Sequence, residues 1–440
     1  MKTQTPIETV SIHTLGCRSN QYDTSAIEDQ ISSGGLKLVP FTSPADACII
    51  NTCTVTGRTD AQSRQAIRKA LRLNPSALVI VTGCYAQVSP DDIAEIDGVD
   101  LVLGNPEKGR VMEFLTKGRP KSTRAVVGPS ELGTPFSLRA KNIRGRTRAN
   151  LKIQDGCDRS CTYCIIPQAR GRSKSLEAET IISEIKDLCE KGFREFVFTG
   201  IHLGGWGTDF KDSSHLTKLL KKIEAQNFPA RFRLSSIDPD EITDELIDLL
   251  KGAKTICNHL HLPIQSGSDA ILRLMHRPYT TDFFSEIVNK LFARVPGISI
   301  GTDIITGFPG ETEIEFEKTR SLIEALPLNY LHVFPYSVRR GTPAATLPGK
   351  VHPAIIKERS AILRKIDAEK REKFYRGFIG SKTNVLIESA RDKDTGLMKG
   401  RSSNYIPVLI EDYPGAQSGE FSEVLLKEAT RKAMFAMVCP

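Results

Sequence analysis

The chain has 440 residues, a formal net charge of +8 at pH 7 and 10 cysteines. This length exceeds one ordinary hydrophobic core, so we expect two or three domains. No stretch approaches a membrane span, and the polar N-terminus lacks an apolar signal segment. We therefore expect a cytoplasmic protein without membrane association, in which clustered cysteines bind metals. The positive charge allows a polyanionic partner without requiring one.

The N-terminal part repeats one pattern three times, in which an apolar run typical of a strand ends near a cysteine. Helical stretches at 23–32 and 59–73 separate the runs. Such alternation predicts a parallel sheet, whose carboxyl strand ends share one edge. The sequence therefore predicts a three-cysteine cluster site, against the alternative of three buried strand-end residues. The runs and their cysteines are 9–15 with Cys17, 47–50 with Cys53 and 78–81 with Cys84.

A connector follows, and we place a basic linker at 120–146. Its second half leads into a run of basic residues from 139 to 152 that contains no acid. A run of this kind is either a solvated face or a nucleic-acid contact. Arg144, Arg146 and Arg148 are the candidates for RNA binding.

Cys157, Cys161 and Cys164 follow at CxxxCxxC spacing. An iron-sulfur cube has four corners, so three thiolates on one loop leave the fourth iron open to an exchangeable ligand. A structural zinc site needs four ligands, and no second pair follows within reach. A thioredoxin-type pair would leave Cys157 unexplained. We predict a cluster, with zinc, redox and core cysteines as the alternatives.

The region after residue 150 alternates strands with helices six times, which predicts a partial barrel with its chemistry at the carboxyl ends of the strands. Its first strand leads directly into Cys157. The predicted strands are 151–154, 195–199, 231–235, 259–263, 299–305 and 330–336, and the predicted helices are 177–191, 214–225, 240–250, 281–293 and 311–325.

Several strand ends in this region carry candidate ligand groups. The stretch 199–207 is glycine-rich, which lets backbone approach a ligand closely. Polar residues follow the strands at 261–268 and 303–311. Glu311 is expected to complement a helix dipole.

The C-terminal part begins with a charged amphipathic helix at 352–376. Short β-rich runs at 383–387, 405–410 and 423–426 then predict a small all-β module, whose last strand the irregular tail at 433–440 leaves undefined. Small β-barrels often bind single-stranded or looped RNA, although fold alone does not prove it. The remaining cysteines are expected to be core residues: Cys48, Cys189, Cys257 and Cys439.

Taken together, the two sets of cysteines and the order of the predicted domains resemble the methylthiotransferase branch of the radical S-adenosylmethionine (SAM) enzymes. The stretches 14–21 and 155–167 are most similar to the MtaB group. The resemblance implies an α/β protein with an N-terminal parallel-sheet domain (1–119), a partial (β/α)6 radical SAM barrel (147–374) and a TRAM-like β-barrel (375–440).

The resemblance implies methylthiolation at C2 of N6-threonylcarbamoyladenosine at tRNA position 37. The MiaB group, which acts on isopentenyladenosine, and the RimO group, which acts on an aspartate of a ribosomal protein, are the alternatives. A non-catalytic iron-sulfur protein that binds RNA is the alternative from another class.

The implied cofactors are two [4Fe-4S] clusters and SAM, with an electron donor such as flavodoxin or ferredoxin and tRNA as partners. Reductive cleavage of SAM at the Cys157 cluster would yield a 5′-deoxyadenosyl radical, and the Cys17 cluster would carry the sulfur. The residues expected near SAM are Tyr163, Thr199, Gly200, Gly204, Ser235, Gln265 and Asp303. Lys399 and Arg401 join the candidates for RNA contact.

The chain departs from the family pattern at Gln168, where an aromatic residue is usual. Arg170 and Gly171 remain. The departure puts a contact near the SAM loop in doubt, but not the chemistry.

Overall fold

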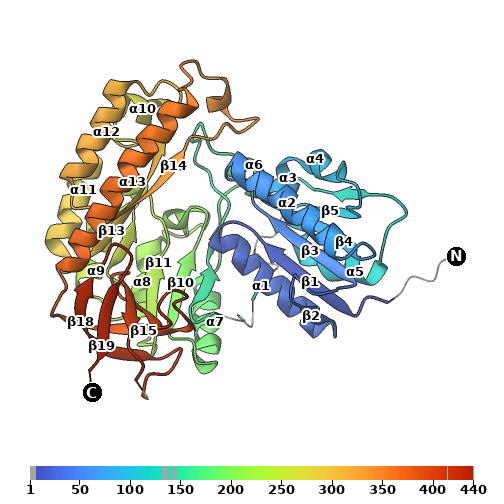
Figure 1. Cartoon of the computed structure of the whole chain (residues 1–440), viewed down its shortest axis with the longest axis horizontal. Coiled ribbons are helices and arrows are strands. Elements are labelled where there is room, and N and C mark those ends of the chain that lie inside the picture. Colours follow the sequence, from blue (N-terminus) through green and yellow to red (C-terminus); the bar gives the residue numbers. More distant parts are fainter. Residues whose placement is uncertain are drawn as a thin grey trace.

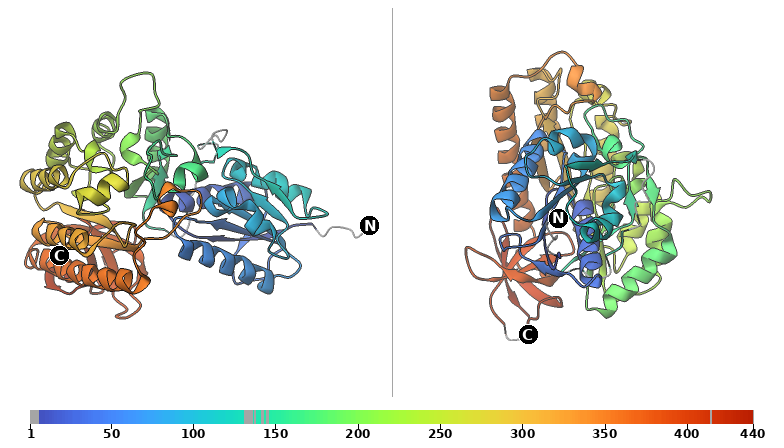
Figure 2. Two further views of the ribbon diagram at one scale, coloured as in Figure 1. Left: turned by 90° about the horizontal axis from the view of Figure 1, so that it is seen from above. Right: turned by 90° about the vertical axis from the view of Figure 1, so that its right-hand side faces the viewer.

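The computed structural model describes residues 6–130, 136, 138–140, 143, 146–413 and 415–439. An N-terminal α/β domain projects from one side of a central barrel, and a small β-barrel lies at one end of that barrel (Figures 1 and 2). Within the described residues, no helix is long and apolar enough to cross a membrane.

The N-terminal domain is built on a parallel sheet of 6 strands in the order β2-β1-β3-β4-β5-β6. Every residue of β3 and β4 is buried because helices cover both faces, which is why these strands read as continuous apolar runs. The predicted parallel sheet is confirmed. Its strands are β1 (Thr9–Thr14), β2 (Lys37–Val39), β3 (Ala47–Thr52), β4 (Leu78–Gly83), β5 (Leu101–Leu103) and β6 (Arg124–Val126).

Three strands of this sheet were not anticipated. β2, β5 and β6 have 3 residues each, too few for a periodic pattern, and β6 lies in the stretch that we expected to be linker. The helical segments are α1 (Arg18–Ser33), α2 (Gly57–Leu73), α3 (Cys84–Val88), α4 (Pro90–Ala94), η1 (Pro106–Arg110) and α5 (Val111–Lys117).

The central region has two three-stranded parallel sheets, which isolated bridges from Phe232 to Ile256 and from Ser236 to His261 join into one curved wall. The predicted partial barrel is confirmed. Its strands are β7 (Ala149–Lys152), β10 (Glu195–Thr199), β11 (Arg231–Leu234), β12 (His259–His261), β13 (Ser299–Thr306) and β14 (Tyr330–Pro335).

Helices cover the outer face of this wall. They are α7 (Ala178–Glu190), α8 (Leu216–Glu224), α9 (Asp244–Gly252), α10 (Asp269–Leu274), α11 (Thr281–Arg294) and α12 (Glu313–Ala325). The short elements are β8 (Gln154–Asp155), α6 (Ile166–Arg170), β9 (Lys174–Ser175), η3 (Leu203–Gly205), η4 (Pro239–Glu241) and η5 (Pro343–Thr346).

The first barrel strand was predicted wrongly at its ends, since β7 starts at Ala149 and not at residue 151. The chain then turns, and β8 pairs with β9 in an antiparallel ladder before the cysteine loop. Asn150 and Lys152 are both buried and point toward the N-terminal domain, where Gln21 and Asp23 accept their hydrogen bonds. The apolar pattern that we used to place the strand misses these polar positions.

Side chains alternate along the barrel strands. The apolar positions Phe196, Phe198 and Phe232 stack together in the core beneath the helices. Three of the alternating positions are charged, and there the buried Glu195 pairs with Arg231 and Arg233. This side of β10 and β11 therefore carries a buried ion-pair network.

The C-terminal helix α13 (Pro353–Arg376) packs along β14 and leads into a closed barrel in the order β15-β16-β17-β19-β18. This confirms the predicted helix and the small all-β module. The strands are β15 (Lys382–Arg391), β16 (Met398–Ser402), β17 (Pro407–Ile410), β18 (Phe421–Ala429) and β19 (Met434–Val438). The tail at 433–440 therefore does supply a last strand.

Candidate metal centres

Three cysteines lie at the carboxyl ends of adjacent parallel strands. Cys17 follows β1 and precedes α1, Cys53 directly follows β3, and Cys84 follows β4 and begins α3. The ladder pairs Thr14 with Asn51 and Thr52 with Gly83, so these strand ends share one edge of the sheet. We call these three cysteines the assembled site.

The strand ends in the assembled site approach one another closely. Gly16 has a φ of +96°, and a Cβ added there would lie 2.5 Å from Cys53 Cβ and 2.6 Å from Cys53 Sγ. Burial, together with the neighbouring thiols of Cys84 and Cys17, raises the pKa of Cys53 to about 11. A bound metal would supply the positive charge that a thiolate needs there.

Cys157, Cys161 and Cys164 lie in one loop between β8 and α6, and we call them the loop site. The backbone turns inside the loop, where the Cys164 amide donates to the Cys161 carbonyl at 3.1 Å. Arg277 Nη1 donates to Cys161 Sγ at 3.3 Å. Burial raises the pKa of Cys157 to about 12 and that of Cys164 to about 11.

The spacing of the sulfurs argues against a single metal ion in either site. Among the described residues, the one group of three His, Cys, Asp or Glu ligands whose atoms all lie within 4.8 Å is His261, Asp303 and His332. A tetrahedral zinc with Zn–S bonds of about 2.3 Å would hold its sulfurs only ~3.8 Å apart. An iron-sulfur cube separates its thiolates further, because each binds a different iron. Both sets of cysteines therefore fit a cluster better than zinc.

A buried ionic network joins the two sites, and the sequence did not reveal it. Lys108 Nζ and Lys152 Nζ donate to the two carboxylate oxygens of Asp23 at 2.9 and 2.6 Å. Arg170 Nη1 donates to both oxygens of Asp155, and its Nη2 donates to Asp23 at 3.2 Å. All five side chains are at most 7% exposed.

The network holds three cations and two carboxylates, so one positive charge is in excess. Burial opposes the charge of Arg170, but Asp155, Cys84, Asp23 and Cys17 raise the pKa of its guanidinium. The excess charge therefore faces the assembled site, where it suits a cluster ligated by thiolates.

The residues expected near SAM lie on or after the barrel strands. Gln265 has a φ of +74°, and its backbone N–H donates to the backbone carbonyl of Asp303 at 2.8 Å. Ser235 Oγ is buried without a hydrogen-bond partner in the described chain, as a group awaiting a ligand would be. The Tyr163 ring packs edge-on against Phe308.

The glycine-rich stretch after β10 is used for packing. Thr199 is buried, and its hydroxyl donates to the Val197 carbonyl. Gly200 lies against Gln154, and Gly204 lies against Glu241. These two glycines let neighbouring side chains pack closely, and the role that we predicted for them near SAM stays a prediction.

Asp303 lies in a chain of hydrogen bonds across the barrel interior. Its Oδ1 faces His261 Nε2 at 2.8 Å and His332 Nδ1 at 3.1 Å, while the Tyr330 hydroxyl faces His259 and His261. Burial alone would raise the pKa of Asp303, but the two histidines lower it. Spacing in the sequence did not predict this group.

The candidate RNA-binding residues fall into different surroundings. Arg146 donates to Gln21, and Arg148 pairs with Glu388 of the small barrel at 3.2 Å. Lys399 and Arg401 lie on β16 at the partly exposed positions that alternate with the buried Met398, Gly400 and Ser402, and Arg401 lies over the ring of Tyr405. Arg144 lies outside the described residues.

Gln168 contacts the loop after β14, where its side-chain amide donates to the Gly341 carbonyl at 3.0 Å.

The remaining cysteines agree with their expected roles only in part. Cys48 and Cys257 are fully buried, whereas Cys189 and Cys439 are half-buried.

Two family descriptions match this chain. Residues 151–323 match the radical SAM superfamily, and residues 9–104 match "Uncharacterized protein family UPF0004". The first range contains the loop site and the second contains the assembled site.

The chain is similar over nearly its full length to named tRNA-modifying proteins. It is 40% identical to the threonylcarbamoyladenosine tRNA methylthiotransferase MtaB of Bacillus subtilis, over 92% of this chain and 90% of that protein. Identity to the MtaB of Aquifex aeolicus is 39%, over 95% of this chain and 100% of that protein. Identity to the tRNA-2-methylthio-N(6)-dimethylallyladenosine synthase of Moorella thermoacetica is 34%, over 93% of each.

Among solved structures, the radical SAM methyltransferase TsrM of Kitasatospora setae, with cobalamin and a [4Fe-4S] cluster bound, resembles this chain in fold. The TM-score is 0.59 with 17% identity, over 77% of each chain. At this identity the likeness concerns the fold alone.

Proposed function

This chain belongs to the radical SAM tRNA methylthiotransferases, and we propose that it converts N6-threonylcarbamoyladenosine in tRNA to its 2-methylthio derivative. The observation that carries the proposal is its identity of 36–40% to four MtaB proteins over more than nine tenths of its length. Relatives that act on dimethylallyladenosine are less similar, at 32–34%.

Members of this family use [4Fe-4S] clusters and SAM, which supply the radical and the sulfur chemistry when bound. In the proposal, Cys157, Cys161 and Cys164 hold the cluster that binds SAM. The assembled site holds the second cluster. The buried network of Asp23, Lys108, Lys152, Arg170 and Asp155 holds the two sites together, because it ties α1, which follows Cys17, to Asp155 and α6, which flank the loop site.

The other residues bind and orient. We assign SAM to the carboxyl ends of the barrel strands, near Ser235, Gln265 and Asp303, where the unpartnered Ser235 hydroxyl supports the choice. We assign the RNA to the side where the small barrel meets the central barrel, with Arg148, Lys399 and Arg401 as contacts. A reducing compartment such as the cytoplasm, with flavodoxin or ferredoxin as electron donor, suits oxygen-sensitive clusters.

Nucleoside analysis of tRNA from cells with and without the gene tests the proposal. We expect 2-methylthio-N6-threonylcarbamoyladenosine to disappear without the gene and to return with the wild-type chain, but not with Cys157→Ala or Cys17→Ala. Cys189→Ala, on the outer helix α7, is the matched control and should restore the product.

Each alternative function has its own outcome in this experiment. Loss of 2-methylthio-isopentenyladenosine alone would assign the chain to the other tRNA substrate. Unchanged tRNA with a modified ribosomal protein lost would point to a protein substrate. Unchanged products of both kinds, with no 5′-deoxyadenosine released on reduction with SAM, would leave a non-catalytic RNA-binding protein.

A further inference from the structure

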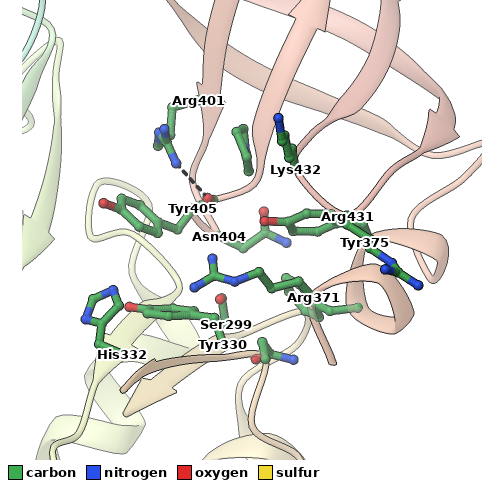
Figure 3. A pocket seen from close by; sticks show the side chains of 13 residues that line it. Ser299, Tyr330, His332, Arg371, Tyr375, Arg401, Asn404, Tyr405, Arg431 and Lys432 are labelled. Atoms are coloured by element: carbon green, nitrogen blue, oxygen red, sulfur yellow. Dashed lines mark hydrogen bonds between the residues drawn. The ribbon is translucent and has the colours of Figure 1, made fainter. Parts of the chain in front are cut away.

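A cavity of about 470 Å³ lies where the small barrel, the end of α13 and the central barrel meet (Figure 3). Its volume is in the range of small-molecule sites. Among the described residues that line it, none is acidic. The lining includes three tyrosines and three arginines: Tyr330, Tyr375, Tyr405, Arg371, Arg401 and Arg431.

Positive charge gathers around Tyr405 in this cavity. Arg401 and Arg233 lie 4.6 and 4.9 Å from the centre of its ring, and Arg18 Nη2 donates to its hydroxyl at 3.3 Å. Burial would raise the pKa of Tyr405, yet these arginines and Arg148 lower it. An anion placed near this hydroxyl would therefore be stabilised.

The acids around the cavity are already engaged. Glu195 pairs with Arg231 and Arg233, Asp367 pairs with Arg371, and Glu372 pairs with Arg376 and Arg431. Glu388 lies 3.2 Å from Arg148 and 3.8 Å from Arg401.

Arg401 is paired only at long range: its Nε lies 3.8 Å from Glu388, and its Nη1 donates to the backbone carbonyl of Tyr405 at 3.2 Å. Its Nε is buried without a hydrogen-bond partner in the described chain, and burial lowers the pKa of its guanidinium. A buried polar group without a partner destabilises the protein unless a ligand satisfies it.

One side-chain contact links the cavity to the assembled site. Arg233 donates to the carbonyls of Ser402 and Ser403, which docks the turn before β17 onto the end of the central barrel. Tyr405, in that turn, reaches Arg18, whose preceding residue is Cys17. Arg18 would therefore connect a nucleotide held here to the surroundings of the cluster that we propose carries the sulfur.

We propose that this cavity binds an oxyanion of the RNA substrate and that Arg401 is the residue that selects for it. Aromatic side chains suit a splayed-out base, and guanidinium groups suit a carboxylate or phosphate. Two groups on the substrate have this chemistry, the carboxylate of the threonylcarbamoyl group and a backbone phosphate. The dimethylallyl group has no charge, so the first source would also select between the two modified adenosines. The inference rests on the proposed function.

Binding of synthetic anticodon stem-loops to the anaerobic holoenzyme tests the proposal. One loop carries threonylcarbamoyladenosine, and the other carries the same nucleoside with its carboxylate converted to a carboxamide. Arg401→Gln should weaken binding of the first loop about 10- to 100-fold. Arg320→Gln, on the outer face of α12, removes the same charge and should change the binding of neither loop. Iron content and SAM cleavage without RNA check that Arg401→Gln is folded.

The pattern of loss identifies the source of the oxyanion. Weaker binding of only the loop that carries threonylcarbamoyladenosine assigns Arg401 to the carboxylate. Equally weakened binding of both loops, with the slope of log Kd against log salt concentration reduced by about one, assigns Arg401 to a phosphate. Equal weakening with unchanged salt dependence is a structural effect and overturns the proposal, as does binding that does not change. If the wild-type protein binds the first loop but forms no methylthio product, the proposed function fails while the binding site stands.

Discussion

Cys157, Cys161 and Cys164 lie in one loop, whereas Cys17, Cys53 and Cys84 come from the ends of three strands that a parallel sheet brings together. The loop site depends on a short stretch of backbone with its own turn. The assembled site depends on the register of β1, β3 and β4 and therefore on the packing of a whole domain.

This difference implies different sensitivities to mutation. Substitutions far from the assembled site act on it through the sheet, because a change in strand position moves a cysteine. The loop site responds mainly to changes in its own stretch and in its direct contacts. The buried network around Asp23 is the exception, since it contacts the surroundings of both sites.

Replacement of all three cysteines of one site by alanine should have the largest effect. We expect each triple variant to lose about four of about eight irons per chain, because the proposal gives each site one cube. The Cys157, Cys161 and Cys164 variant should release no 5′-deoxyadenosine with SAM and reductant, whereas the Cys17, Cys53 and Cys84 variant should still release it. Loss of all iron in either variant would contradict independent sites.

Asp23→Asn should break the link between the sites. It leaves three buried cations with one carboxylate, and we expect a loss of about 3–5 kcal/mol in the free energy of unfolding. Denaturant unfolding of the anaerobic protein measures this. Asp97→Asn removes the same charge from an exposed position in the same domain and should change stability little. Similar losses in the two variants would show that the network does not stabilise the protein.

Gly16→Ala should damage the assembled site selectively. An L-residue at a φ of +96° costs about 1–2 kcal/mol, and the added Cβ also meets Cys53. We expect weaker iron retention at the assembled site and unchanged SAM cleavage at the loop site. Gly35→Ala is the matched control, since its φ is +81° and nothing lies within 4 Å of an added Cβ. Equal iron loss in both variants would mean that strain alone, and not the contact with Cys53, is responsible.

Ile49→Val should have the smallest effect. Ile49 is fully buried in β3, and removal of one methyl group costs about 0.5–1.5 kcal/mol. We expect the assembled site to release iron at a lower denaturant concentration than in the wild type. The matched variant Ile300→Val, in β13, should leave that midpoint unchanged. A shift of the same size in both would argue that the domains unfold as one unit.

Much of the fold was readable from local pattern. Residues 195–199 form a strand at the predicted ends because an apolar run stands between polar segments. α13 begins at Pro353, directly after the predicted start, since proline suits the first turn of a helix. β2, β5 and β6 were missed because 3 residues show no period.

The candidate sites divide in the same way. The cysteines were readable because strand ends and close spacing are local properties. The network was not, since Asp23 and Lys152 are 129 residues apart and a single polar residue on a helix carries no pattern. The contact from Arg18 to Tyr405 spans 387 residues and was equally hidden.

The sequence by itself determined the order of the domains, the parallel sheet, the partial barrel and the two sets of cysteines, because periodicity and spacing are properties of neighbouring residues. Only the tertiary structure decided which charges lie together. The excess cation near Cys17 and Cys84, and the arginines around Tyr405, arise where separate domains meet, and the chain encodes these contacts only through its packing.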